Sequence, residues 1–351
     1  MPHIDIQTAT GPFSFCYYIA TPNSDSADKI DPNLPSVIFL HAGYAAQEIF
    51  EWQFADRNLR QFNLIGIDMR GFGDTKGVIG EATFTPADSA ADVEQIMAQL
   101  QIPPSHFFGL SNGCTVALEL AIAHPHLVLS LTLCSPTSRV EPEDVAFGRM
   151  EVYRYWVAMD ESTKLNGDEP ELDEELVAEV MTGAMQLLFN LEKNNRLEAM
   201  GGRALAIAKR NWTGSQEALK QSYKTNIEWF LKRRVIPGKE LATINVPVAI
   251  IHCSEDIGYP LESAQEIEQS LRQAGVPNVH LHRVPGAHFG NVTHPEGVNL
   301  ILLKNVLSCH PDFKHDTDTS LGVTHASARL STPFTEFLVE CGYDPEESDS
   351  E

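Results

Sequence analysis

A serine stands between two glycines in the stretch FFGLSNGCTVALELA, which begins at Phe107. Apolar residues typical of a buried strand precede Gly109, and alanine- and leucine-rich residues typical of a helix follow Gly113. A strand that enters a helix through Gly-x-Ser-x-Gly makes a tight turn and strains the backbone of the serine, Ser111. Side chains in place of the glycines would collide where strand and helix approach. The turn exposes the Ser111 hydroxyl beside a helix N-terminus, where negative charge is favoured.

A serine hydroxyl is a poor nucleophile at neutral pH, so this chemistry also needs a base and an acid. The apolar run VPVAIIHC is followed by Asp256, and the run NVHLHRV is followed by His288 in the loop PGAHFGN. The order serine, acid, histidine places each group after a predicted strand, at the edge where open α/β sheets hold their sites. Ser111, His288 and Asp256 are therefore the predicted nucleophile, base and orienting acid.

The elements that must position these residues alternate between short apolar runs and helical patterns. In the first part of the chain we predict strands over 36–41, 62–68, 106–110 and 127–136, and helices over 86–102 and 112–125. After residue 246 the same rhythm returns with strands over 246–253 and 278–284 and helices over 261–275 and 293–308. This order predicts a parallel sheet that is covered by helices on both faces.

With these elements in place, the chain resembles the α/β-hydrolase superfamily over about residues 10–308. The resemblance rests on FLHAGY, DMRGFGDT, GLSNG and the pair Asp256 and His288. It implies an α/β fold with a doubly wound, mostly parallel sheet of the eight-stranded type and a helical lid insertion. The spacing from Asp256 to Pro260 matches the family pattern, which favours Asp256 over its neighbour Glu255 as the acid.

The resemblance also implies the groups that stabilise a tetrahedral oxyanion, namely the backbone N–H groups of Asn112 and Gly43. Three residues depart from the usual pattern of the family. Ala42 replaces the glycine of a His-Gly pair, Cys114 replaces a glycine or alanine after the turn, and Asp74 replaces a serine in the RGxGxS loop. These departures remove no catalytic group, but they predict a different shape for the oxyanion loop.

Helical patterns without strands dominate the middle of the chain, so we expect four segments. Residues 1–137 and 241–308 form the two parts of the α/β-hydrolase core. Residues 138–240 form a helical lid over the strand ends, where it excludes water and shapes the pocket. Residues 309–351 form an acidic C-terminal extension that is partly disordered, with a short helix near TPFTEFLVE.

The expected activity is that of a serine hydrolase on a carboxylic ester or lactone, through an acyl-enzyme. Aromatic residues of the lid indicate an apolar pocket for a small to medium uncharged substrate, and we expect Tyr44, Tyr153 and Trp156 to line it. The same three catalytic groups also serve C–C bond hydrolases, acyltransferases and cofactor-free haloperoxidases in this superfamily, and fold alone does not decide among them. A non-catalytic ligand receptor is the remaining alternative.

Other polar residues could compete for these roles. His280 and His282 share one strand face, but a metal site would need a third ligand. Arg70 lies in a glycine-rich loop that lacks the lysine and the spacing of a phosphate-binding loop, so we interpret it as structural rather than as a carboxylate ligand.

The composition bounds the partners of the chain. Its 48 acidic and 25 basic residues give a formal net charge of −23, which disfavours binding to nucleic acid and to anionic membranes. The six cysteines form no CxxC pair, no run of about 18 apolar residues predicts a membrane span, and no secretory signal is visible. We therefore expect a cytoplasmic enzyme for a small-molecule substrate, with no metal and no cofactor.

Overall fold

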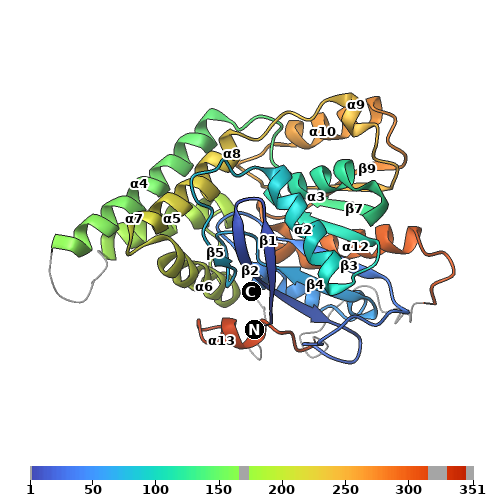
Figure 1. Cartoon of the computed structure of the whole chain (residues 1–351), viewed down its shortest axis with the longest axis horizontal. Helices are drawn as coiled ribbons and strands as arrows, with labels where there is room; N and C mark the ends of the chain where they lie inside the picture. The colour runs from blue at the N-terminus through green and yellow to red at the C-terminus, as the bar shows by residue number, and fades with distance from the viewer. Residues whose placement is uncertain (1, 166–173, 315–329, 345–351) are drawn as a thin grey trace.

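A mostly parallel sheet forms the centre of the computed structural model, which describes residues 2–165, 174–314 and 330–344 (Figure 1). Its strands are β1 (His3–Thr8), β2 (Gly11–Ala20), β3 (Ser36–Leu40), β4 (Asn63–Ile67), β5 (Lys76–Gly77), β6 (Ser105–Leu110), β7 (Val128–Cys134), β8 (Val248–Cys253) and β9 (Val279–Val284). Eight of them follow the order β1-β2-β4-β3-β6-β7-β8-β9, and the two-residue strand β5 pairs with β2. The predicted strands and the predicted fold class are confirmed.

The N-terminal strands are the part of the sheet that the sequence patterns did not predict. β2 pairs antiparallel with β1 and with β4, whereas the pairs from β4 through β9 are all parallel. β1 alternates half-exposed and buried residues, as an edge strand with one solvated face does, so it lacks the continuous apolar run of the central strands.

Helices cover both faces of the sheet and connect its strands. They are α1 (Glu51–Phe54), α2 (Pro86–Leu100), α3 (Asn112–Ala123), α4 (Glu143–Leu165), α5 (Glu174–Phe189), α6 (Asn195–Trp212), α7 (Gln216–Tyr223), α8 (Trp229–Leu231), α9 (Gly238–Leu241), α10 (Leu261–Gln273), α11 (Gly290–Thr293), α12 (Pro295–Ser308) and α13 (Thr335–Val339). α2 begins as its sequence predicts, because Pro86 occupies its first turn and Thr85 and Asp88 cap each other.

Two hydrophobic clusters lie on opposite faces of the sheet. Along β3, Ile38 and Leu40 join the cluster that α2, α3 and α10 cover. Val37 and Phe39 join the other cluster, which α1, α11 and α12 cover. Because successive side chains of a strand point to opposite faces, β3 is buried on both sides, and all its residues after Ser36 are apolar.

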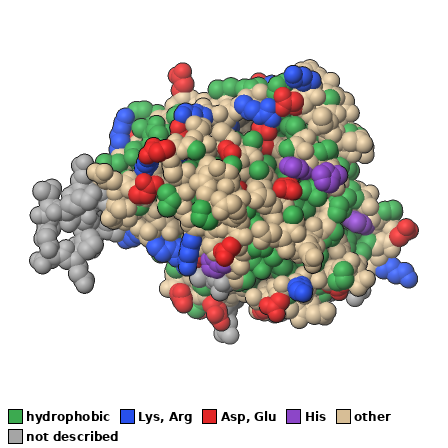
Figure 2. Space-filling view, viewed as in Figure 1, with side chains coloured by type: hydrophobic (Ala, Val, Ile, Leu, Met, Phe, Trp, Pro, Cys, Tyr) green, Lys and Arg blue, Asp and Glu red, His purple; other side chains and the backbone are tan. Residues whose placement is uncertain are grey.

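The long helices of the middle of the chain lie between β7 and β8 in sequence, and we call α4 to α9 the helical insertion. In Figure 1, α4 to α7 project to one side of the sheet rather than covering either face. No helix in the described part of the chain is long and apolar enough to cross a membrane. On the molecular face shown in Figure 2, acidic and basic side chains are interspersed among apolar ones.

The C-terminal segment returns to the core. Part of the predicted extension over 309–351 lies outside the described residues, but residues 330–344 are described and include the predicted short helix as α13. Phe334 is fully buried, with its ring centroid 4.9 Å from that of Phe54 and 5.6 Å from that of Tyr18. The aromatic and aliphatic residues of this segment therefore complete one of the two hydrophobic clusters.

This contact yields a stability prediction. Phe334→Ala should lower the free energy of unfolding by about 3–5 kcal/mol, because it removes a buried ring and leaves a cavity. Urea unfolding followed by circular dichroism measures the change. Val339→Ala on the same helix is the matched control, since Val339 is 47% exposed and its loss should cost less than about 0.5 kcal/mol. Equal, small effects of the two substitutions would show that the segment does not stabilise the core.

Candidate active site

Ser111 occupies a strained turn between β6 and α3. Its φ of 55° and ψ of −117° lie outside the conformations that most residues adopt. A Cβ at Gly109 would lie 2.6 Å from the backbone N of Cys114, and a Cβ at Gly113 would lie 2.1 Å from the carbonyl O of Leu40. Both glycines are therefore required by close backbone contacts, which confirms the predicted reason for their presence.

The structure brings the three predicted catalytic side chains into one hydrogen-bonded line. His288 Nε2 lies 2.8 Å from Ser111 Oγ, and His288 Nδ1 lies 2.6 Å from Asp256 Oδ2. The other carboxylate oxygen of Asp256 accepts the backbone N–H groups of Gly258 and Tyr259, at 3.0 and 2.9 Å. All three side chains are buried, so the carboxylate is fixed in place and holds the imidazole toward the hydroxyl.

The two predicted oxyanion donors differ in availability. The N–H of Asn112 is in the first turn of α3, where backbone N–H groups have no acceptor within the helix. The N–H of Gly43 donates instead to the side-chain oxygen Oδ1 of Asn112. In this structure an anion at Ser111 would therefore have to displace the Asn112 side chain to reach Gly43, which sequence reasoning did not foresee.

His41 fixes the loop that carries Gly43. Its Nδ1–H donates to the carbonyl O of Ala42 at 2.7 Å, and its Nε2 accepts the N–H of Met69 at 2.9 Å. Complete burial lowers the pKa of His41 to about 4. The neutral imidazole thus joins two loops at the edge of the sheet, and protonation would remove its acceptor atom.

The rival residues lie elsewhere. Glu255 is exposed, and Asp256 is the carboxylate that contacts the histidine. Arg70 is buried, forms two hydrogen bonds to the Asp92 carboxylate and stacks on aromatic rings, which confirms its structural role. Among the residues that the structure describes, no cluster of three or more His, Cys, Asp or Glu side chains could hold a metal.

The predicted pocket residues separate into two groups. Tyr44 has a strained φ of 60° and lines a cavity of about 390 Å³ as well as a smaller, apolar one of about 50 Å³. Tyr153 instead packs against Tyr223, and Trp156 packs against Trp212. Neither Tyr153 nor Trp156 lines those two cavities, so the structure places both in helix packing.

Sequence reasoning missed Arg149, which lies in α4 and lines the larger cavity. A signal was available in the helical spacing. Val145, Val152 and Trp156 stand at positions that share one apolar face of α4 with Arg149. A charged residue on a buried helix face requires polar partners. Its position on that face therefore predicts a buried polar cluster around Arg149.

The sequence and the structure were compared with those of known proteins, and the comparison identifies the family of this chain. The family model for the alpha/beta hydrolase fold matches residues 35–295. The chain belongs to the α/β-hydrolase family. The enzymatic character of this α/β-hydrolase is supported by sequence relatives that are named as enzymes.

Three relatives indicate how distant the similarities are. The chain is 25% identical to the AB hydrolase superfamily protein YisY of Bacillus subtilis over 244 residues, 68% of this chain and 80% of YisY. It is 23% identical to 3-oxoadipate enol-lactonase 1 of Acinetobacter baylyi over 264 residues, 75% of this chain and 85% of that protein. A thermophilic esterase from Thermogutta terrifontis shares the fold with a TM-score of 0.63 at 15% identity, covering 88% of this chain and 100% of that one.

The buried His41 predicts a pH dependence of stability in this α/β-hydrolase. Its folded pKa of about 4 lies below the ordinary value of 6.5, so the unfolded chain binds a proton in that interval that the folded chain does not. The contribution of His41 to the free energy of unfolding is therefore fully present above pH 6.5 and is lost as the pH falls toward 4. We expect His41→Asn to reduce the pH slope of unfolding free energy between pH 7 and 5 by about 1 kcal/mol per pH unit.

Urea unfolding of both proteins between pH 7 and 5 measures these slopes. The same substitution at the exposed His280 serves as the control and should leave the slope unchanged. Parallel curves for the parent and His41→Asn would contradict the buried, neutral state of His41.

Proposed function

We propose that this chain is a serine hydrolase that cleaves a carboxylic ester or lactone through an acyl-enzyme. The observation that carries the proposal is the line from Ser111 through His288 to Asp256, with heavy-atom distances of 2.8 and 2.6 Å. Family members named esterase and enol-lactonase act on this class of bond, which supports the same class here.

The proposed reaction needs only these side chains and water. His288 Nε2 takes the hydroxyl proton while Ser111 Oγ attacks the carbonyl carbon, and Asp256 stabilises the resulting imidazolium. The tetrahedral intermediate collapses, the leaving alkoxide takes the proton from His288, and an acyl-enzyme remains. Water then attacks the acyl carbon with His288 as base, which releases the carboxylic acid and restores Ser111.

The oxyanion is stabilised in this proposal by the N–H groups of Asn112 and Gly43. Because Asn112 Oδ1 already accepts the Gly43 N–H, the second donor is released when the Asn112 side chain turns away. A hydrogen bond of this kind contributes about 0.5–1.5 kcal/mol net, so its rupture is a modest cost within a catalytic cycle.

The helical insertion is proposed to act as a lid, with its boundaries near residues 138 and 240. Phe230 of α8 supports this role, since its Cζ lies 3.0 Å from the position that a Cβ would take at Gly43. The insertion thus reaches the oxyanion loop itself, and a side chain in place of Gly43 would crowd the ring. Ser111 is itself buried, so in this proposal the lid keeps water from its hydroxyl until substrate enters.

A reducing, cytoplasmic compartment is part of the proposal. All six cysteines are unpaired thiols, and Cys16, Cys114, Cys134 and Cys253 are buried among apolar residues. Thiols in such positions behave as small apolar side chains and need no oxidising environment.

Labelling with a fluorophosphonate probe tests the nucleophile. We expect stoichiometric modification of Ser111, located by mass spectrometry of the digested protein, because His288 activates its hydroxyl. Ser111→Ala should abolish labelling and lower kcat for p-nitrophenyl esters by at least about 10³-fold, with an unchanged circular dichroism spectrum.

His288→Gln should have an effect similar to that of Ser111→Ala, and His280→Gln is its control on the exposed edge strand β9. Folded protein that is not labelled would refute the hydrolase assignment and favour the ligand receptor.

Asn112→Ala tests the shared hydrogen bond. A phenylboronic acid adduct with Ser111 places a B–O⁻ group where the oxyanion forms, so its affinity reports the donors there. Removing Oδ1 frees the Gly43 N–H, and we expect the inhibition constant of the boronic acid to fall roughly 2- to 10-fold. A rise in that constant would show that the side chain of Asn112 contributes to oxyanion binding instead.

A further inference from the structure

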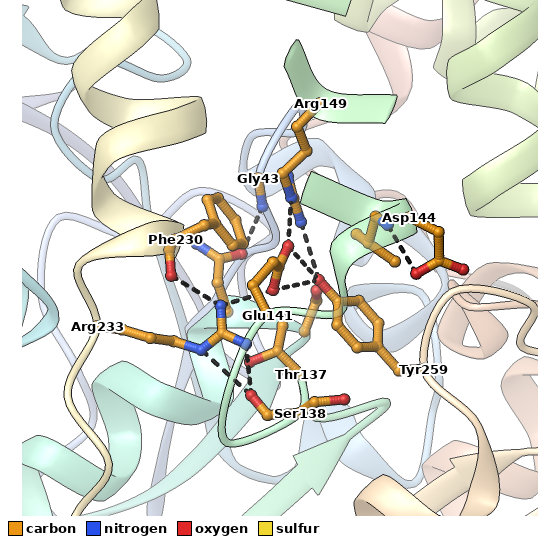
Figure 3. A network of polar contacts seen from close by, with 12 residues as sticks. Gly43, Thr137, Ser138, Glu141, Asp144, Arg149, Phe230, Arg233 and Tyr259 are labelled. Carbon is orange, nitrogen blue, oxygen red and sulfur yellow. Dashed lines mark hydrogen bonds and ion pairs between the residues drawn. The ribbon is translucent and has the colours of Figure 1, made fainter. Parts of the chain in front are cut away.

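Figure 3 shows a buried cluster with unequal charges. It lies beside the proposed catalytic line, because the ring centroid of Tyr259 is 5.2 Å from that of His288. Glu141 accepts Arg149 Nε at 2.7 Å and Arg233 Nη1 at 2.6 Å. The side chains of Glu141, Arg149 and Arg233 are only 2, 5 and 3% exposed. The hydroxyl of Tyr259 accepts Arg149 Nη2 and donates to Glu141. Two guanidinium groups and one carboxylate give this cluster itself a net charge of +1.

Two donors at this cluster have no acceptor among the described residues. They are Arg149 Nη1 and the hydroxyl of Tyr44, and both atoms are buried. The guanidinium Cζ of Arg149 lies 5.6 Å from the ring centroid of Tyr44, so the two groups are neighbours. If Nη1 donated to the phenol oxygen, the phenol proton would still lack an acceptor. A buried donor without an acceptor costs about 1–3 kcal/mol, and more when it is charged.

Both residues line the cavity of about 390 Å³ between the insertion and the core. Two residues that line this cavity belong to loops of the proposed site, those of Gly43 and Asp256. Tyr44 follows Gly43, and Gly258, which also lines the cavity, donates its N–H to Asp256. The smaller apolar cavity shares Tyr44 and is lined by several aliphatic side chains of α5 and α6, namely Met181, Met185, Leu188, Met200 and Ile207.

Carboxylates also occur around the cavity, but in a different setting. Asp144, Glu151 and Glu179 line it and are exposed to solvent. Water and salt screen charges at such positions, whereas the charge of Arg149 acts in a buried, less polar environment. A negative group that enters the cavity and reaches Arg149 is therefore attracted by Arg149 more strongly than it is repelled by the three exposed carboxylates.

We infer that Arg149 Nη1 and the Tyr44 hydroxyl bind a carboxylate of the substrate. This inference rests on the proposed function: the substrate is an ester or lactone that carries a carboxylate apart from the bond cleaved at Ser111. The carboxylate supplies the missing acceptors and neutralises the surplus charge, and the apolar cavity receives the aliphatic part. The sequence-based expectation of an uncharged substrate is replaced by that of an anionic one.

Two esters of equal chain length test the inference. Mono-p-nitrophenyl adipate carries a free carboxylate, and p-nitrophenyl hexanoate is its neutral counterpart. We expect the wild-type enzyme to prefer the adipate monoester. Tyr44→Phe should lower the ratio of the two kcat/KM values at least about tenfold, because one hydrogen bond to a charged group is lost. Tyr153→Phe is the matched control and should leave this ratio unchanged, since Tyr153 packs outside the cavity.

Arg149→Met should lower the same ratio further, and it should remain folded because Glu141 keeps Arg233 as a balanced partner. Circular dichroism and urea unfolding verify folding. A ratio that Arg149→Met and Tyr44→Phe both leave at the wild-type value would overturn the inference and leave the hydrolase assignment intact.

A binding experiment separates the inference from the proposed function. In Ser111→Ala, titration calorimetry with monomethyl adipate should give a dissociation constant that Arg149→Met raises at least tenfold. Inorganic phosphate is the second titrant, and tighter binding of phosphate than of the adipate monoester would overturn the choice of a carboxylate. If Ser111 is not labelled but monomethyl adipate still binds through Arg149, the hydrolase assignment fails and the carboxylate site stands.

Discussion

The close contact between β6 and α3 is the constraint on which the site depends. Gly109 of β6 comes so near the backbone of Gly113 and Cys114 in α3 that a side chain has no room, and Ser111 in the turn between them has a φ of 55°. Strain of this kind persists only where surrounding packing determines the backbone. Here β6 lies between β3 and β7 and is buried along its whole length. The Ser111 hydroxyl is therefore positioned by the core of the sheet rather than by a surface loop.

The helical insertion is attached to this core through a loop that departs from its family's usual sequence. Asp74 stands where a serine is usual, and its carboxylate pairs with Arg210 at 2.7 Å and with Arg203 at 3.3 Å, both from α6. Trp212 adds a hydrogen bond from its indole N–H to the carbonyl O of Gly71. The departure thus has a structural explanation, since a carboxylate can bind two guanidinium groups and a serine hydroxyl cannot.

Features that depend on local sequence could be predicted, whereas features that depend on contacts between residues far apart in the chain could not. Apolar runs and Gly-x-Ser-x-Gly predicted the central strands and the three side chains of the hydrogen-bonded line, because local patterns and strand order determine both. The bond from Gly43 to Asn112 joins loops 69 residues apart, and the surplus charge of Arg149 appears only when Glu141 and Arg233 come together. The pairing of β1 and the packing of Phe334 against the core were missed because their apolar residues find their partners far along the chain.

The site retains several features that lower stability, and they converge on one cavity. Ser111 and Tyr44 both have positive φ values, and Tyr44 and Arg149 have buried donors without acceptors. Replacing a buried charge cluster by apolar residues is often neutral or stabilising, so stability alone gives no reason to keep Arg149 here. Folded proteins accept such costs where function requires a preorganised site. In the proposed complex, a carboxylate between Arg149 and Tyr44 would supply the acceptors that these donors lack. The free protein does not have this stabilisation, so the whole of it would contribute to the affinity for such a substrate.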